Sequence, residues 1–412
     1  MASDDPTSTP ATPPFRPNDA FVEAPETFDT YEAPDRAAMT ERARTALVNQ
    51  LGHGEALIAT AYACGTIGVQ AYQTHYSEGY GLLMPLQQGV AVAVRPADAP
   101  RVVLEGENQA WGSEEQRPPW VTAVYRILQE LLADPSIEVA VASTIPSVCR
   151  DGALAALAVA LVRVVRRLNM PTAVDLDRVA DVRDELVPLL AAELGTVIDQ
   201  PYSTAYLLAT FADPDPPFTL VDTSTREHLP VNTAGRTALR WALIDPLDAE
   251  PRSPAFHRGR RRQAETALER LRAGAFEGLG AFRDLEHRDL KRAEEVLSSD
   301  LAPEARHLVT ENRRVQKHVA AMRRADWQMT GALLLMSHAS QRDDWTATPE
   351  AADAVVKAVE TRTHESLYGA CMTGRSGAVL VTGPPDNFER GLRHLVATLA
   401  PMLGHSPRIL AP

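Results

Sequence analysis

The sequence is poor in several features that assign proteins to common classes. Cysteine occurs only three times in 412 residues, which is too few for a disulfide framework and gives no zinc-ligand spacing. Apolar runs are short, and none is long enough to span a bilayer. The N-terminus lacks the basic and then apolar stretch of a signal peptide. We therefore expect a cytoplasmic protein with reduced thiols, no bound metal and no membrane partner.

A surplus of positive charge is also missing. The formal net charge is -13 at pH 7, whereas nucleic acids and anionic membranes attract basic surfaces. A hydrophobic fraction of 45% and a charged fraction of 23% are ordinary for a globular protein. The composition argues against a nucleic-acid partner and leaves the oligomeric state open.

Two stretches divide the chain by composition. Residues 1–28 are rich in Pro, Thr and Asp with little apolar periodicity, which predicts a disordered tail. The Asp-Pro-Asp-Pro-Pro run at 213–217 is the clearest break further on. We expect an N-terminal lobe over 29–215 and a C-terminal lobe over 216–412.

Apolar spacing predicts a mixture of helices and strands, which is typical of an α+β fold. The expected helices are 35–51, 120–132, 152–168, 256–273, 308–324, 329–336, 350–360 and 387–399. The expected strands are 55–69, 81–94 (as one or two strands), 137–141, 206–210, 218–221 and 378–382.

Three segments in the last third of the chain carry a family resemblance. Residues 307–312 read His-Leu-Val-Thr-Glu-Asn, residues 337–345 read Ser-His-Ala-Ser-Gln-Arg-Asp-Asp-Trp, and residues 368–374 read Tyr-Gly-Ala-Cys-Met-Thr-Gly. In this order they resemble motifs of galactokinases, members of the GHMP small-molecule kinase superfamily. Several ordered motifs are more specific than one. The resemblance implies a two-lobed GHMP-kinase-like fold with a cleft between the lobes.

The segment that resembles the phosphate loop of this family departs from its pattern. Such a loop depends on glycines that let backbone N–H groups approach phosphates at a helix N-terminus. Val148 and Arg150 stand at two of those glycine positions, and Asp151 would put a negative charge where a triphosphate lies. Thr66 replaces the arginine that assists phosphoryl transfer in the family. We expect that ATP-dependent sugar phosphorylation is lost and that no cofactor binds; Mg-ATP would be used only by an active kinase.

Three residues are candidates for catalysis. Asp199 matches the catalytic aspartate of the family and would act as a general base, unless it is a capping residue kept for structure. His75 would form an acid/base couple with Asp199, since histidine titrates near neutral pH, unless it is an ordinary loop residue. His257 replaces the sugar-side tyrosine of the family and is the second histidine candidate.

Five residues are candidates for binding a substrate. Arg150 and Arg375 stand where the family has phosphate-side glycines. Their guanidinium groups either bind an anion in place of the phosphates or fill the cleft by pairing with Asp151. The remaining candidates match the sugar side of the family site: Tyr72, Gln73 and Tyr76.

Two cysteines near these segments invite opposite interpretations. Cys149 stands beside Arg150 at an expected helix N-terminus, a setting that lowers a thiol pKa and favours nucleophilic catalysis. No histidine is close to it in sequence. Cys64 is better interpreted as a small buried apolar residue.

The sequence leaves three functions open. The first is a repurposed acid/base enzyme that binds a small polar, sugar-like or anionic metabolite. The second is a pseudokinase, which senses a ligand or binds a partner without turnover. The third is an active ATP-dependent sugar kinase with altered phosphate contacts.

Overall fold

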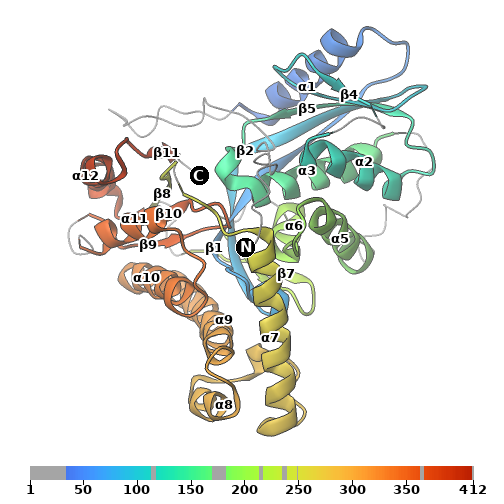
Figure 1. Cartoon of the computed structure of the whole chain (residues 1–412). Helices are drawn as coiled ribbons and strands as arrows, with labels where there is room; N and C mark the ends of the chain where they lie inside the picture. The colour runs from blue at the N-terminus through green and yellow to red at the C-terminus, as the bar shows by residue number, and fades with distance from the viewer. Residues whose placement is uncertain are drawn as a thin grey trace, which may run out of the picture.

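The computed structural model describes residues 34–112, 117–168, 182–212, 217–233, 239–247, 249–361 and 366–410. The tail expected over 1–28 lies outside the described residues, as does most of the break expected at 213–217. Figure 1 shows two groups of elements, one around each of two sheets, with the N-terminal half of the chain in the first and the C-terminal half in the second. The α+β, two-lobed fold expected from the sequence is confirmed.

The first sheet is organised by the long strand β2, which pairs antiparallel with β1, β5 and β6 along different parts of its length. The strand order is β4-β3-β5-β2-β6-β7, with β1 also on β2, and only the β3–β5 pair is parallel in the described residues. The strands are β1 (Ala59–Gln70), β2 (Tyr80–Pro96), β3 (Arg101–Leu104), β4 (Ala110–Trp111), β5 (Ile137–Ser143), β6 (Thr219–Asp222) and β7 (Glu227–Pro230).

Helices cover both faces of this sheet because side chains alternate between faces along a strand. On one face, alanines of β2 and β5 pack against α1 (Arg36–Leu51), whose N-cap is Asp35. The residues at this contact are Met39, Ala43, Ala46, Leu47, Ala91, Ala93, Ala140 and Ala142. On the other face, the intervening valines pack against α2 (Pro119–Leu131) and α3 (Arg150–Val165).

The second sheet is antiparallel in the order β11-β8-β10-β9. Its strands are β8 (Arg240–Asp245), β9 (Gly369–Met372), β10 (Val379–Gly383) and β11 (Arg408–Leu410). The helices of this half are α7 (Pro254–Gly274), α8 (Leu290–Val296), α9 (Ala302–Arg323), α10 (Trp327–Asp343), α11 (Glu350–Glu360) and α12 (Pro385–Leu403). Helices α7, α8 and α9 project together from the sheet at the bottom of Figure 1.

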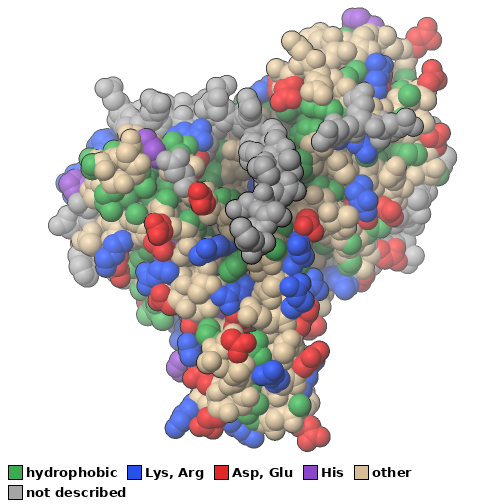
Figure 2. Space-filling view, in the orientation of Figure 1, with side chains coloured by type: hydrophobic (Ala, Val, Ile, Leu, Met, Phe, Trp, Pro, Cys, Tyr) green, Lys and Arg blue, Asp and Glu red, His purple; other side chains and the backbone are tan. Residues whose placement is uncertain are grey.

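Charged side chains of both signs alternate over the visible face of these projecting helices (Figure 2). Arg261 pairs with Glu265 one turn later on α7, and Arg306 of α9 lies 2.6 Å from Glu294 of α8. Arginines of this region therefore have carboxylate partners within the fold.

One expected element is wrong. Residues 206–210 were expected to form a strand but lie in helix α6 (Thr204–Phe211), which follows α5 (Val187–Val197). The segment is apolar and buried on nearly every side, and a short apolar run cannot distinguish a buried helix from a buried strand. The expected lobe boundary at 215 stays a prediction, but β6 and β7 carry the first sheet on to Pro230.

Helix α10 lies against the start of β9 at two glycines. A Cβ atom on Gly331 would lie 2.2 Å from the carbonyl oxygen of Tyr368, and one on Gly369 would lie 2.1 Å from the carbonyl oxygen of Gly331. Both distances are shorter than any real contact of a Cβ atom, so side chains are excluded at both positions. This close approach fixes α10 on the second sheet.

We predict that Gly331→Ala lowers the free energy of unfolding by about 1–3 kcal/mol, because overpacking outweighs the better helix propensity of alanine. Gly259→Ala on α7 is the matched control, since a Cβ atom there meets nothing within 4 Å. The control should raise the free energy of unfolding by up to about 1 kcal/mol. Urea unfolding measures both variants, and equal stability of the two would contradict the close approach.

Candidate functional site

The first turn of α3 lies at the centre of the candidate site. The short 3₁₀ helix Ser147–Cys149 leads from β5 into α3, so that Arg150 and Asp151 open the helix. A carboxylate in the first turn is favourable beside the positive end of the helix dipole. Gly152 follows because a Cβ atom there would lie 2.0 Å from the carbonyl oxygen of Thr66 on β1. The start of α3 is therefore held directly against the strand.

Asp151 forms a two-pronged ion pair with Arg375 across the two lobes. The Nε and Nη2 atoms of Arg375 lie 2.9 and 2.8 Å from the two carboxylate oxygens of Asp151. The side chain of Arg375 is only 5% exposed and that of Asp151 only 8%. The Nη1 atom of Arg375 also donates to the carbonyl oxygen of Pro201, at 3.1 Å, in the loop between α5 and α6. One guanidinium thus ties together α3, this loop and the turn after β9.

The charges around Asp151 keep it ionised. Burial alone would raise the pKa of its carboxyl group, but the charges of Arg375 and Arg150 lower that pKa to about 2. The Nε atom of Arg150 lies 3.7 Å from the carboxylate of Asp151, and its side chain is 31% exposed. Burial lowers the pKa of Arg150, and the charge of Asp151 opposes this shift. Two guanidinium groups thus share one carboxylate, and Arg375 is its closer partner.

Little open space remains beside this ion pair. A cavity of about 20 Å³ is lined by Tyr72, Gln73, Asp151 and Arg375, among others. A second cavity of about 10 Å³ lies between Val148 and the turn after β9. A single water needs roughly 10–15 Å³, whereas ligand pockets are usually about 300–1,000 Å³. In this conformation the two cavities take waters rather than a metabolite.

The structure thus brings together Tyr72, Gln73, Arg150 and Arg375 of the residues expected to bind a substrate. The ring of Tyr72 is buried and packs edge-on against His307 at 6.3 Å between centroids. The backbone of Gln73 is in the left-handed region (φ 62°). The residue is buried, and its Oε1 atom has no hydrogen-bond partner among the described residues. Arg150 and Arg375 both pair with Asp151, which is the second of the two interpretations drawn from the sequence.

Asp199 lies apart from this cluster. Its side chain is 75% exposed and lies 2.5 Å from the guanidinium of Arg258 on α7. Its backbone is left-handed, with a φ of 52°. Together with Arg258 it lines an open hollow of about 710 Å³, which does not include Tyr72 or Gln73. The catalytic role expected for Asp199 stays a prediction.

The two candidate histidines differ in what can be described. The side chains of His75 and Tyr76 lie outside the described residues, although their backbone belongs to a 3₁₀ helix, Thr74–Ser77. His257 opens α7 and is only 1% exposed; neither ring nitrogen has a hydrogen-bond partner in the described structure. Burial, with the charge of Arg375, lowers the pKa of His257 to about 3. His257 is therefore neutral at physiological pH.

The lowered thiol pKa expected from the position of Cys149 is wrong. Its thiol is buried, and burial raises its pKa, as do the negative charges of Asp245 and Asp151. Cys149 therefore stays a protonated thiol despite its place at the start of α3. Cys64 is half-buried rather than buried.

Sequence reasoning missed the side chains that close the site from its flanks. The hydroxyl of Tyr202 donates to the carbonyl oxygen of Asp151, and that of Thr373 donates to the carbonyl oxygen of Gly68 at 2.6 Å. Tyr206 lines both small cavities. These contacts join segments far apart in the chain, and no local pattern signals them.

We predict that Asp151→Asn lowers the free energy of unfolding by about 3–5 kcal/mol, because it leaves Arg375 buried without its partner. Asp199→Asn is the matched control, since it removes a carboxylate from an exposed ion pair and should cost less than about 1 kcal/mol. Urea unfolding near neutral pH compares the two variants with the wild type. Equal costs would show that the buried pair does not constrain the fold.

The difference between wild type and Asp151→Asn should also depend on pH. The folded-state pKa of Asp151, about 2, lies below the ordinary aspartate pKa of about 3.9. Its contribution is therefore fully present above pH about 4 and is lost as the pH falls through about 2. Unfolding curves between these values should converge for the two proteins, whereas a constant difference would contradict the assigned pKa shift.

No group of three or more His, Cys, Asp and Glu side chains in the described part of the chain could hold a metal ion. Among the described helices, none combines the length and apolar character that a membrane span needs.

The fold is that of a group of small-molecule kinases. A crystal structure of Lactococcus lactis galactokinase with galactose matches 90% of this chain and 96% of its own, with a TM-score of 0.76 and 18% identity. The structure of Methanococcus jannaschii mevalonate kinase matches 87% of this chain and 98% of its own, with a TM-score of 0.54 and 10% identity. The likeness at these identities shows the shared fold.

The chain is also similar in sequence to galactokinases. The Thermotoga petrophila galactokinase is 26% identical over 346 residues, covering 81% of this chain and 92% of that protein. The Mycobacterium bovis galactokinase is 36% identical over 173 residues, covering 37% of this chain and 46% of that protein. No protein-family model matches the chain. The protein is galactokinase-like in sequence and in fold.

Proposed function

We propose that this galactokinase-like protein has lost ATP-dependent sugar phosphorylation and acts as a pseudokinase that binds a ligand without turnover. The observation that carries the proposal is the buried Asp151–Arg375 pair at the N-terminus of α3. By the galactokinase resemblance, this helix end is where a kinase would hold the nucleotide phosphates. Phosphoryl transfer depends on positioning and electrostatic stabilisation, so the charges at this point decide whether it proceeds.

The residues present do not fit Mg-ATP. A triphosphate would meet the carboxylate of Asp151, and the cavity between Val148 and the turn after β9 is only about 10 Å³. Arg375 could contact a phosphate only by leaving Asp151, which would then be buried without its strongest partner. The active-kinase alternative is supported by the similarity to galactokinases over four-fifths of the chain, and it requires this rearrangement.

A repurposed acid/base enzyme has less support. Asp199 is exposed and paired with Arg258, so it is not held toward Tyr72 and Gln73. His257 is a weak base, because its pKa is lowered to about 3. His257 therefore does not exchange protons near neutral pH, and Asp199 lines a different hollow from Tyr72 and Gln73. A protein without turnover is therefore better supported than an acid/base enzyme.

We predict that the protein shows neither sugar-dependent ADP formation nor thermal stabilisation by Mg-ATP. Differential scanning fluorimetry compares Mg²⁺ alone, ATP alone and both together, and a coupled assay with galactose follows ADP. An active galactokinase run in parallel shows that both assays respond. Stabilisation that needs Mg²⁺ and ATP together, accompanied by galactose-dependent ADP release, would contradict the proposal.

A further inference from the structure

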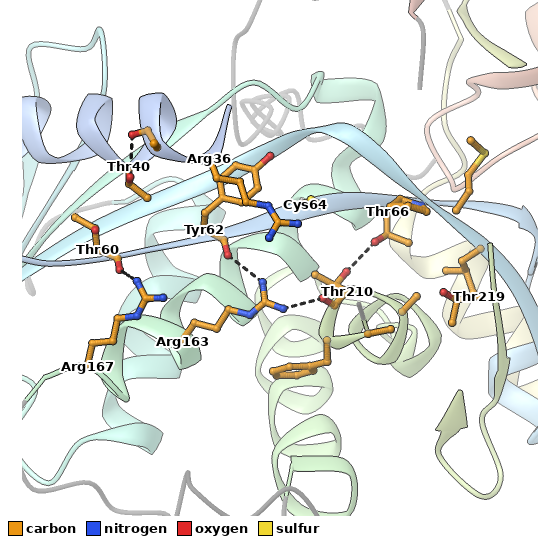
Figure 3. Close-up of a pocket in the computed structure, with 17 residues that line it drawn as sticks. Arg36, Thr40, Thr60, Tyr62, Cys64, Thr66, Arg163, Arg167, Thr210 and Thr219 are labelled. Carbon is orange, nitrogen blue, oxygen red and sulfur yellow. Dashed lines mark hydrogen bonds between the residues drawn. The ribbon is translucent and has the colours of Figure 1, made fainter. Parts of the chain in front are cut away.

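A pocket much larger than the two small cavities lies away from the Asp151–Arg375 cluster. It has a volume of about 600 Å³, within the usual range of ligand sites. Figure 3 shows its walls: the start of α1, the first half of β1, the C-terminal half of α3 and the end of α6. Three arginines line it: Arg36 from α1, Arg163 from α3 and Arg167 from the turn that follows α3.

Arg163, near the end of α3, and Arg167, two residues beyond that end, cover the outer edge of β1. Arg163 donates to the carbonyl oxygens of Tyr62 at 2.9 Å and of Thr210 at 3.4 Å, and Arg167 donates to that of Thr60 (Figure 3). Each guanidinium has five N–H donors, so these bonds leave others available. Because the acceptors are neutral carbonyls, the positive charges are not neutralised.

No carboxylate opposes these charges among the described residues that line the pocket. Burial lowers the pKa of Arg163, as do the positive charges of Arg36, Arg166 and Arg167, while only the thiol of Cys64 shifts it the other way. Of the three pocket arginines, Arg163 is partly buried and the other two are exposed. Two more deeply buried arginines of the fold pair with acids: Arg95 lies 2.6 Å from Glu138, and Arg314 lies 2.7 Å from Glu311. The pocket thus concentrates positive charge that the described fold does not compensate.

Hydroxyl groups complete the lining. They belong to Thr40, Thr60, Thr66, Thr210 and Thr219. Hydroxyls can donate to anionic oxygens and also accept from the hydroxyls of a polyol. Guanidinium groups bind carboxylates and phosphates through paired, charge-assisted hydrogen bonds.

We propose that this pocket binds a small organic anion with two or more negative charges, of the phosphorylated-metabolite class, held by Arg36, Arg163 and Arg167. The anion would supply the negative charge that the walls lack. The proposal does not depend on whether phosphoryl transfer is lost, because the pocket contains neither Asp151 nor Arg375.

Inorganic pyrophosphate is the probe, titrated calorimetrically into the full chain at constant ionic strength set with sodium chloride. Saturable binding is expected for the wild type. Arg36→Gln should weaken it by about tenfold or more, because a charge-assisted contact is lost. Arg36 is exposed and makes no described hydrogen bond to the backbone, so this variant should fold normally. Circular dichroism verifies folding.

Arg166→Gln is the matched control. Arg166 is an exposed residue at the end of α3 and does not line the pocket, yet its removal lowers the net charge equally. This control should bind within about threefold of the wild type, since exposed charges are screened by salt. Absence of saturable pyrophosphate binding, or equal loss in both variants, would overturn the proposal.

Asp151→Asn separates this proposal from the proposed function. It should bind pyrophosphate like the wild type. If pyrophosphate binds more tightly to Asp151→Asn than to the wild type, and equally well to Arg36→Gln, the anion binds at the start of α3. That result would overturn the assignment to this pocket. Failure of the kinase assays to match their prediction would leave the pyrophosphate results unaffected.

Discussion

The ion pair between Asp151 and Arg375 is the constraint on which the rest of the site depends. It joins the first turn of α3 to the turn after β9, and Arg375 adds a bond to the loop between α5 and α6. A buried ion pair adds little net stability by itself, but removing either partner leaves a charge in a low-dielectric setting. The pair therefore holds the start of α3 and the turn after β9 together. With the pair formed, Tyr72 and Gln73 line only a small cavity beside it.

Close backbone packing and the placing of charge are separate features of this fold. Two close backbone approaches need glycine: α3 against β1 at Gly152 and α10 against β9 at Gly331. These contacts determine how the elements pack, and they accompany the galactokinase fold. The charged groups fall into two sets: Arg150 and Arg375 share the carboxylate of Asp151, whereas Arg163 and Arg167, at the edge of β1, donate to neutral carbonyl oxygens. The first arrangement closes a site and the second leaves one open to an anion.

The sequence predicted the fold because ordered motifs and apolar periodicity agree along most of the chain. It also offered the pairing of Arg375 with Asp151, since the resemblance placed both at the same phosphate-side position. It could not distinguish helix α6 from a strand, because the run is apolar on every side. It misjudged Cys149, because a helix N-terminus lowers a thiol pKa only when burial does not outweigh it. The exposure of Asp199 and the pocket around Arg163 depend on contacts between distant segments.

We propose that Asp151 and Arg375 close the position where a kinase would hold nucleotide phosphates. A crystal structure determined with saturating Mg²⁺ and a non-hydrolysable ATP analogue tests it most directly. We predict that the guanidinium of Arg375 stays on the carboxylate of Asp151 and that no nucleotide occupies the N-terminus of α3. A nucleotide bound there, with Arg375 turned away from Asp151 toward its phosphates, would contradict the account.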